Sequence, residues 1–209
     1  RLRGRIESIL DYARARGWRA GENPARWRGH LSQTLPPRSK IAPVQHHPAL
    51  PWKEMGTFLA QLRLERGVAA RALEFAILTA ARSGEVRGAH WKEVNLREKT
   101  WTIPATRMKA GKEHRVPLSD AAIKLLRDIS ADATPKPDGS IFQPTRSEKL
   151  SEMALTMVLR RMNRPDLTVH GFRSSFRDWV SEATAYAREV AEAALAHTLD
   201  DKVEAAYRR

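Results

Sequence analysis

Side chains that suit phosphate binding stand where predicted helices begin or end. Arg82 lies where one predicted helix stops and a turn begins, and His170 precedes Arg173 by three residues. Residues three apart on a helix share one face, so this histidine and this arginine are expected to be neighbours. Guanidinium groups form paired hydrogen bonds with phosphate oxygens. The pattern therefore predicts a site that binds a phosphate group.

A basic turn and the C-terminal segment extend this set. Lys109 and Lys112 lie on either side of Gly111 between two predicted strands, so the end of a hairpin is expected to carry cations. His197 closes a short predicted helix, and Tyr207 follows it by ten residues. All four polar side chains can donate hydrogen bonds to phosphate oxygens.

Each of these residues also has an ordinary structural explanation. Arg82 can form a surface ion pair, and His170 can be a partly buried histidine with its hydrogen bonds satisfied. His197 can cap the C-terminus of a helix, where positive charge is favoured. Tyr207 can pack as a core aromatic on an alanine-rich helix. Only the set as a whole distinguishes a catalytic site from these alternatives.

The elements that must hold these residues are mainly helices. Short alternating segments predict strands at 94–96, 100–103 and 114–118, the last two joined as a hairpin. Ser119 is expected to cap the helix that follows it. The fold class is therefore α+β and mostly helical. Apolar residues at helical spacing predict helices at about 1–18, 52–66, 69–81, 119–129, 147–162, 172–184, 187–196 and 200–209.

Proline divides the chain into segments. Five prolines, with basic residues between them, lie at positions 24–48, which is the composition of a linker. We therefore expect a helical N-terminal segment at 1–20, a linker at 21–50 and the main domain at 51–209. The last residues look like a helix without a stop signal, so we expect a chain that is cut short soon after Tyr207.

Charge indicates the class of partner. The 209 residues include 37 Lys and Arg against 24 Asp and Glu, a net charge of +13. Such a surplus favours nucleic acid as the partner, with an anionic membrane surface second. The absence of cysteine excludes a disulfide scaffold, a cysteine nucleophile and cysteine-bound metal. No apolar run is long enough for a transmembrane helix.

Taken in order, these residues resemble the catalytic domain of the tyrosine recombinase (phage integrase) family. The sequences of residues 101–104, 108–118 and 202–207 are similar to those of prophage and genomic-island integrases. The resemblance covers roughly residues 52–209. The positions that match the family's catalytic set, with one supporting acid, are Arg82, Glu85 (supporting), Lys109, His170, Arg173, His197 and Tyr207.

The resemblance implies a site-specific DNA recombinase that integrates or excises a mobile element through a 3′-phosphotyrosine intermediate. It implies that residues 1–20 end a helical core-binding domain. Two alternatives stay open: a catalytically inactive DNA-binding regulator on the same fold, and a strand relaxase like type IB topoisomerases. Because the bond energy is kept in the protein–DNA linkage, neither a cofactor nor a metal is expected.

The resemblance also assigns roles. Tyr207 is expected to be the nucleophile, and Arg82 and Arg173 to bind the phosphate oxygens. His170 serves as base or proton relay, and His197 donates a further hydrogen bond. Glu85 is expected to brace the site. Lys109 is the expected general acid, with Lys112 as its rival.

The expected partners are double-stranded DNA at attachment sites, further copies of the chain in a homotetramer, and an accessory DNA-bending or directionality protein. No membrane partner is expected, and the expected place of action is the bacterial cytoplasm, in association with the nucleoid. Backbone contacts would make DNA affinity depend strongly on salt. The cations proposed to contact DNA are Arg87, Lys92, Arg107, Lys112, Arg115 and Arg177.

Overall fold

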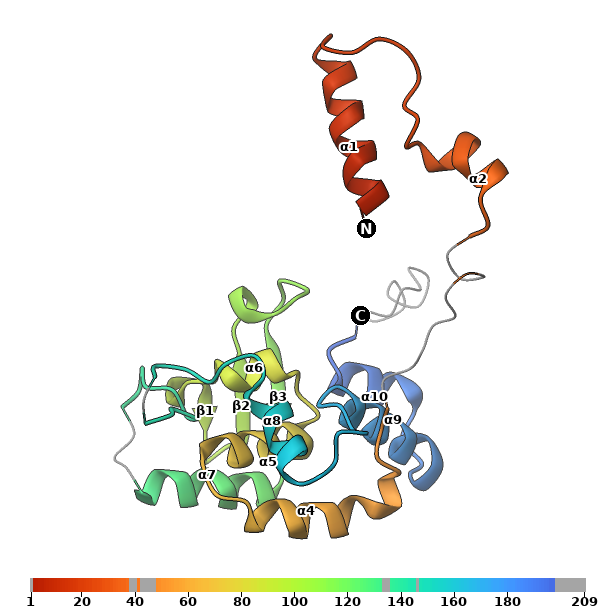
Figure 1. The fold of residues 1–209 in the computed structure, drawn as a ribbon. Helices are drawn as coiled ribbons and strands as arrows, with labels where there is room; N and C mark the ends of the chain where they lie inside the picture. Colours follow the sequence, from red (N-terminus) through yellow and green to blue (C-terminus); the bar gives the residue numbers. More distant parts are fainter. Residues whose placement is uncertain (1, 38–40, 42–47, 133–135, 146, 198–209) are drawn as a thin grey trace. The chain divides into compact units, whose positions relative to one another are not determined.

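The computed structural model of the chain is drawn in Figure 1. It describes residues 2–37, 41, 48–132, 136–145 and 147–197. The chain forms two compact units, Arg1–His46 and His47–Arg209. The predicted helix at 200–209 lies outside the described residues.

The N-terminal unit is organised around α1 (Leu2–Ala15). Asn23 turns back onto this helix, and its side-chain amide donates to the backbone oxygen of Glu7 over 2.9 Å. The backbone N–H of Trp27 donates to the carboxylate of Glu7 over 3.1 Å. A short helical turn, α2 (Ser32–Thr34), follows. The first part of the predicted linker is therefore held against α1.

The larger unit is mostly helical, as the sequence predicts. Its central helix is α5, which contacts α4, α6, α7 and α8 (Figure 1). A helix that packs against several neighbours must be apolar around most of its surface, and seven of the twelve residues of α5 are buried. The helices are α4 (Met55–Leu64), α5 (Val68–Thr79), α6 (Ser83–Arg87), α7 (Asp120–Asp132), α8 (Ala154–Arg161), α9 (Gly171–Ala183) and α10 (Arg188–Ala194).

The helix predicted from residue 147 begins later than expected. The helix α8 starts at Ala154, and residues 147–153 form turns instead. Leu150 is buried in this segment, and its carbonyl accepts a hydrogen bond of 3.1 Å from Arg87. A contact between segments far apart in the sequence thus overrides the local helical pattern. No helix in the described part of the chain is long and apolar enough to cross a membrane.

The small sheet has three antiparallel strands in the order β1 (Val94–Asn95), β2 (Thr100–Ile103) and β3 (His114–Pro117). Trp101 pairs with Val116 across the hairpin. The predicted strands are confirmed with slightly shorter ends. The turn that carries the two candidate lysines therefore occupies residues 104–113.

Buried contacts anchor the base of this hairpin. Trp101 is fully buried and packs on Phe75 of α5, with ring centroids 5.2 Å apart. Its indole N–H donates to the buried carboxylate of Glu93 over 3.0 Å. Arg107 donates to the same carboxylate over 2.8 Å. The turn therefore leaves the core from a fixed position.

The start of α9 is held by the segment that enters the larger unit. The hydroxyl of Ser175 donates to the carbonyl of Leu50, and that of Thr168 donates to the carbonyl of Pro48. Gly171 lies against this segment so closely that a Cβ there would overlap the Pro48 carbonyl. Only glycine fits, because the opposing atoms are backbone and cannot rotate away.

We expect Gly171→Ala to lower the free energy of unfolding by about 2–3 kcal/mol, the upper range for overpacking. The measurement is urea denaturation followed by circular dichroism. The matched control is Gly56→Ala on α4, where a Cβ would meet nothing within 4 Å. That change should be neutral or stabilising by up to about 1 kcal/mol. Equal effects of the two changes would contradict the close packing at Gly171.

Candidate active site

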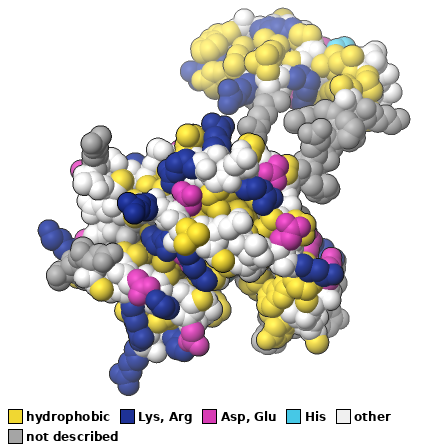
Figure 2. Space-filling model, turned by 60° about the horizontal axis from the view of Figure 1, so that its bottom comes forward, with side chains coloured by type: hydrophobic (Ala, Val, Ile, Leu, Met, Phe, Trp, Pro, Cys, Tyr) yellow, Lys and Arg dark blue, Asp and Glu magenta, His cyan; other side chains and the backbone are white. Residues whose placement is uncertain are grey.

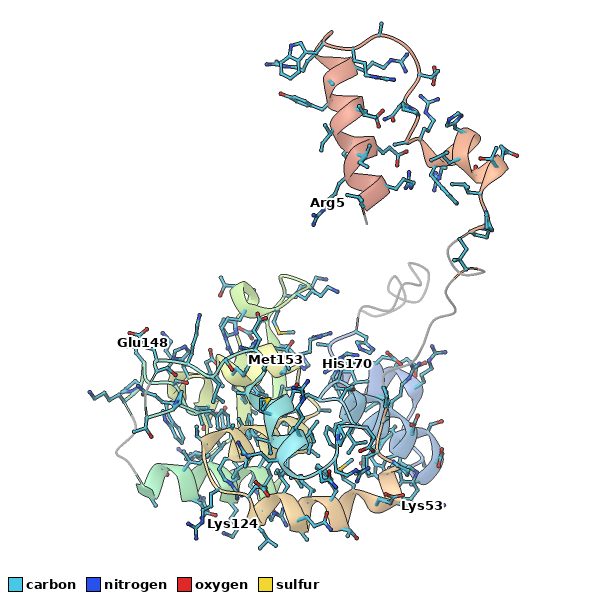
Figure 3. The ribbon with its side chains drawn as sticks, viewed as in Figure 1. Arg5, Lys53, Lys124, Glu148, Met153 and His170 are labelled. Atoms are coloured by element: carbon cyan, nitrogen blue, oxygen red, sulfur yellow. The ribbon has the colours of Figure 1, made fainter. Side chains whose placement is uncertain are left out.

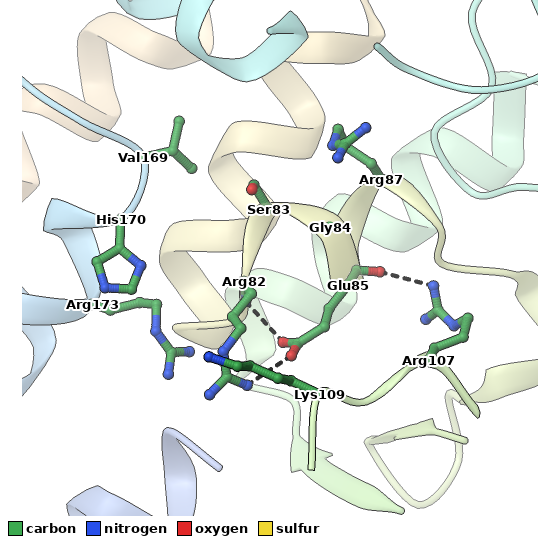
Figure 4. A pocket seen from close by; sticks show the side chains of 10 residues that line it. All are labelled: Arg82, Ser83, Gly84, Glu85, Arg87, Arg107, Lys109, Val169, His170 and Arg173. Atoms are coloured by element: carbon green, nitrogen blue, oxygen red, sulfur yellow. Dashed lines mark hydrogen bonds and ion pairs between the residues drawn. The ribbon is translucent and has the colours of Figure 1, made fainter. Parts of the chain in front are cut away.

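A cleft of about 390 Å³ opens in the larger unit (Figure 4). Five of its lining side chains are cations and one is a carboxylate, so it suits an anionic ligand. The lining residues are Arg82, Ser83, Gly84, Glu85, Arg87, Arg107, Lys109, Val169, His170 and Arg173.

Three separate segments bring the predicted groups together in this cleft. Arg82 immediately precedes α6, Lys109 lies in the hairpin turn, and Arg173 is in the first turn of α9. Figure 4 shows that these three side chains extend into the same space. His170 is exposed at the N-terminus of α9 and lines the same cleft (Figure 3). Of the two rival lysines, Lys109 is among the lining residues and Lys112 is not.

Arg82 is held by its neighbour Glu85. The backbone N–H and the guanidinium of Arg82 each donate to one carboxylate oxygen of Glu85, both over 2.8 Å. Glu85 is only 5% exposed, so the carboxylate is a fixed acceptor. A second guanidinium nitrogen donates to the carbonyl of Ala196 over 3.3 Å. These contacts fix the direction of the Arg82 side chain while leaving it partly exposed.

Arg173 is the most deeply buried cation of the cleft. Its guanidinium donates to the carbonyl of Ala80, which ends α5, and to that of Leu195, which ends α10, the second over 2.6 Å. Burial, and then the nearby charge of Arg82, lowers the pKa of Arg173 to about 10. This value still leaves the side chain protonated at neutral pH.

Two of the carbonyls that face these arginines belong to alanines in left-handed backbone conformations. Ala80 has a φ of 50° and Ala196 a φ of 48°. Such conformations cost roughly 1–2 kcal/mol each for residues with a Cβ. Strained positions of this kind cluster at functional sites, where the surrounding structure maintains them.

His197 completes the group from the end of α10. Its Nε2 lies 3.1 Å from a guanidinium nitrogen of Arg173, and its Nδ1 lies 2.6 Å from a carboxylate oxygen of Glu192. Burial acts to raise the pKa of Glu192, but the hydrogen bond from His197 and the charge of Arg177 outweigh it. The pKa of Glu192 therefore lies below its ordinary value.

Glu192 is a site residue that the sequence analysis missed. The available signal was an acid on the short helix that ends at a candidate histidine. Five residues separate the two, which does not correspond to the usual helical neighbours. They meet because the chain leaves the helical path after α10, at the left-handed Ala196.

Two cations expected to contact DNA are paired with buried carboxylates. Arg107 donates to Glu93 and, over 3.1 Å, to the carbonyl of Glu85. Arg177 lies 3.0 Å from Glu192. A Cβ at Gly88 would collide with the Arg107 guanidinium, so glycine makes room for this brace. The DNA contacts of Arg107 and Arg177 stay a prediction.

Of the other candidates for DNA contact, Arg87 is half-buried and donates to the carbonyl of Leu150, and the other three are exposed. Lys92 pairs with Asp138 over 2.7 Å, and Arg115 pairs with Glu113 over 3.1 Å. Lys112 is exposed in the hairpin turn. On the face drawn in Figure 2, Lys and Arg side chains are interspersed with acidic and apolar ones. Basic groups are instead concentrated in the lining of the cleft.

Tyr207, the predicted nucleophile, lies outside the described residues. Its role as nucleophile is therefore part of the functional proposal. Among the residues that the structure describes, no group of three or more His, Cys, Asp or Glu side chains could hold a metal ion.

Comparison with known proteins identifies the relatives of this chain. The profile of the Phage integrase family matches residues 53–209. The integrase of Enterobacteria phage P4 is 32% identical over 225 residues, which cover 99% of this chain and 49% of that protein. The chain thus spans about half the length of this curated relative.

Solved structures share the fold. A lambda integrase dimer bound to a COC′ core site superposes with a TM-score of 0.67 at 19% identity, covering 100% of this chain and 71% of that chain. A lambda integrase tetramer bound to a Holliday junction superposes with a TM-score of 0.65 at 20% identity, covering 96% of this chain and 58% of that chain. The expected fold, a tyrosine recombinase catalytic domain with a small antiparallel sheet, is confirmed. Because the family profile matches most of the length of this chain, the chain belongs to the phage integrase family.

Proposed function

We propose that this protein is a site-specific DNA recombinase that cleaves and rejoins DNA strands through a 3′-phosphotyrosine intermediate. The observation that carries the proposal is the convergence of Arg82, Lys109 and Arg173 in one cationic cleft. A phosphodiester carries one negative charge, and two guanidinium groups can each donate to its non-bridging oxygens.

The reaction exchanges one phosphoester for another. The phenolic oxygen of Tyr207 attacks phosphorus, the new oxygen–phosphorus bond forms, and the bond to the 5′ oxygen breaks. Charge gathers on the non-bridging oxygens in the transition state, where Arg82 and Arg173 stabilise it. One such donor contributes about 3–4 kcal/mol to lowering the barrier. In the rejoining step the 5′ hydroxyl of the incoming strand attacks the same phosphorus, and the bond to Tyr207 breaks and releases the phenol. One phosphoester replaces another in each step, so no external energy source is required.

Two proton transfers accompany each exchange. A tyrosine hydroxyl has a pKa of about 10, so Tyr207 needs a base, and His170 is our candidate for it. The departing 5′ oxygen needs a proton, which we assign to Lys109 because it lines the cleft. His197 donates a further hydrogen bond to the phosphate through Nε2, which requires a proton on both ring nitrogens because the Nδ1–H faces Glu192.

The cleft is arranged before the substrate arrives. Arg173 is already desolvated and held by the carbonyls of Ala80 and Leu195, and Arg82 is held by Glu85. Donors fixed in this way need no reorganisation when charge develops. This preorganisation supports an active enzyme over a regulator that has lost catalysis.

We further propose that the protein acts on double-stranded attachment-site DNA to integrate or excise a mobile element. The dimer and tetramer of lambda integrase support a homotetramer on DNA. An accessory DNA-bending or directionality protein and action at the bacterial nucleoid complete this proposal. Residues 1–20 would end a core-binding domain, 21–50 would link it, and 51–209 would form the catalytic domain.

The nucleophile is tested with Tyr207→Phe, which removes the attacking oxygen and does not change the proposed DNA-binding surface. We expect wild type to form a covalent complex with a nicked duplex that carries the element's end sequence, and the variant to form none. DNA affinity should change less than about twofold, because no phosphate contact is lost. The readouts are a denaturing gel and a filter-binding assay.

The control is Tyr186→Phe, which removes the hydroxyl of a tyrosine that is 66% exposed between α9 and α10. It should form the complex as wild type does. A covalent complex in Tyr207→Phe would refute the nucleophile. No complex from a full-length wild type would favour the inactive regulator, and relaxation of a plasmid without paired sites would favour the topoisomerase-like enzyme.

The general acid is tested by changing the leaving group. We expect Lys109→Ala to slow single-turnover cleavage of ordinary DNA by about 10²–10⁴-fold at saturating DNA. Replacing the bridging 5′ oxygen by sulfur should restore most of the rate, since a thiol has a pKa of about 8.5 and departs without a proton. Lys112→Ala should show no such rescue. Rescue of Lys112→Ala alone would transfer the role to Lys112.

Salt dependence tests the six cations assigned to DNA. A plot of the logarithm of the DNA-binding constant against the logarithm of the salt concentration should have a slope of about −0.9 for each phosphate contact. Six contacts predict a loss of about 10³-fold between 50 and 200 mM salt. Fluorescence anisotropy with a labelled duplex measures this slope. A flat response would exclude backbone contacts as the source of affinity.

A further inference from the structure

Four charged or titratable groups contact one another in the order Arg177, Glu192, His197 and Arg173. One carboxylate oxygen of Glu192 is 2.6 Å from Nδ1 of His197, and the other is 3.0 Å from the guanidinium of Arg177. On its far side, Nε2 of His197 is 3.1 Å from the guanidinium of Arg173. Glu192 is 6% exposed, so solvent does not compete strongly for its oxygens.

These contacts determine which ring nitrogen of His197 carries a proton. A carboxylate only accepts hydrogen bonds, so Nδ1 must be the donor to Glu192. Glu192 is ionised at neutral pH, because its pKa lies below the ordinary value. The guanidinium of Arg173 only donates, so Nε2 of the neutral ring must be the acceptor. Both contacts are satisfied by one tautomer, with the proton on Nδ1.

We propose that Glu192 is a positioning residue that holds His197 by its Nδ1–H and keeps Nε2 beside Arg173, where the phosphodiester binds. This inference rests on the proposed function, since it gives His197 its place next to the scissile phosphate. Arg177 acts one step further away, through its ion pair with the second carboxylate oxygen of Glu192. A helix C-terminal histidine on its own would be free to rotate about its side-chain torsions.

The substitution Glu192→Gln tests this arrangement with almost no change in shape. Arg177 is a donor, so it should attract the amide oxygen of the new side chain and turn the amide NH₂ toward His197. Nδ1 must then accept, and the ring proton moves to Nε2, opposite the N–H groups of Arg173. We expect a reversed tautomer and a ring that is displaced from Arg173.

The first measurement is the ¹⁵N spectrum of the histidine rings in the free protein. Wild-type His197 should carry its proton on Nδ1, and Glu192→Gln should show it on Nε2. A wild-type ring with its proton only on Nε2 overturns the proposal, whether or not the variant folds. Because this readout needs no DNA, it stays valid if the proposed recombinase activity fails.

The second measurement is single-turnover formation of the covalent complex, with DNA affinity measured in parallel. We expect Glu192→Gln to slow cleavage by about 10-fold to 10²-fold, because the displaced ring no longer places Nε2 beside Arg173 and the phosphate. Affinity should change less than about twofold, since Glu192 is buried. Glu192→Asp keeps a carboxylate and should recover part of the rate.

The matched control is Glu189→Gln, which removes an acid from the first turn of the same helix. It should leave the rate unchanged. Equal rates for Glu189→Gln and Glu192→Gln would overturn the positioning role. Absence of any covalent complex in wild type would instead count against the proposed function, and the ring spectrum would still decide whether Glu192 sets the tautomer.

Discussion

The buried guanidinium of Arg173 is the constraint on which the cleft depends. A buried cation is unfavourable unless hydrogen-bond acceptors surround it. Here the acceptors are carbonyls at the ends of α5 and α10, so one side chain ties α9 to both helices. Two alanines in left-handed conformations lie at these ends. The geometry that stabilises Arg173 also places its charge where a phosphate can approach.

The other cleft residues are held by contacts of their own, and these contacts are linked to one another. Glu85 fixes Arg82, and its carbonyl accepts from Arg107. Arg107 in turn meets Glu93, which also holds the buried indole of Trp101. The hairpin is therefore tied to both the core and α6, and its turn presents Lys109 to the cleft. The buried acids among the described residues, Glu74, Glu85, Glu93 and Glu192, each form an ion pair with an arginine.

Local patterns predicted most of the fold because they report which side of each element is buried. The apolar spacing of α5 and the alternation of the hairpin strands are properties of short segments, and both elements appear close to their predicted bounds. Ser119 accepts from the backbone N–H of Ala122, as a capping residue should. The predicted start of α8 at residue 147 was wrong, because a hydrogen bond from Arg87 holds Leu150 outside the helix.

The sequence by itself determined the order of the candidate phosphate-binding residues, the surplus of positive charge and the helical class of the fold. Only the tertiary structure decided that Lys109 lines the cleft while Lys112 does not, and that Glu192 supports His197. It also decided that Arg107 and Arg177 meet buried carboxylates. The reason is that spacing along the chain reports neighbours within one element. Partners on different elements are set by packing and by the burial of charge.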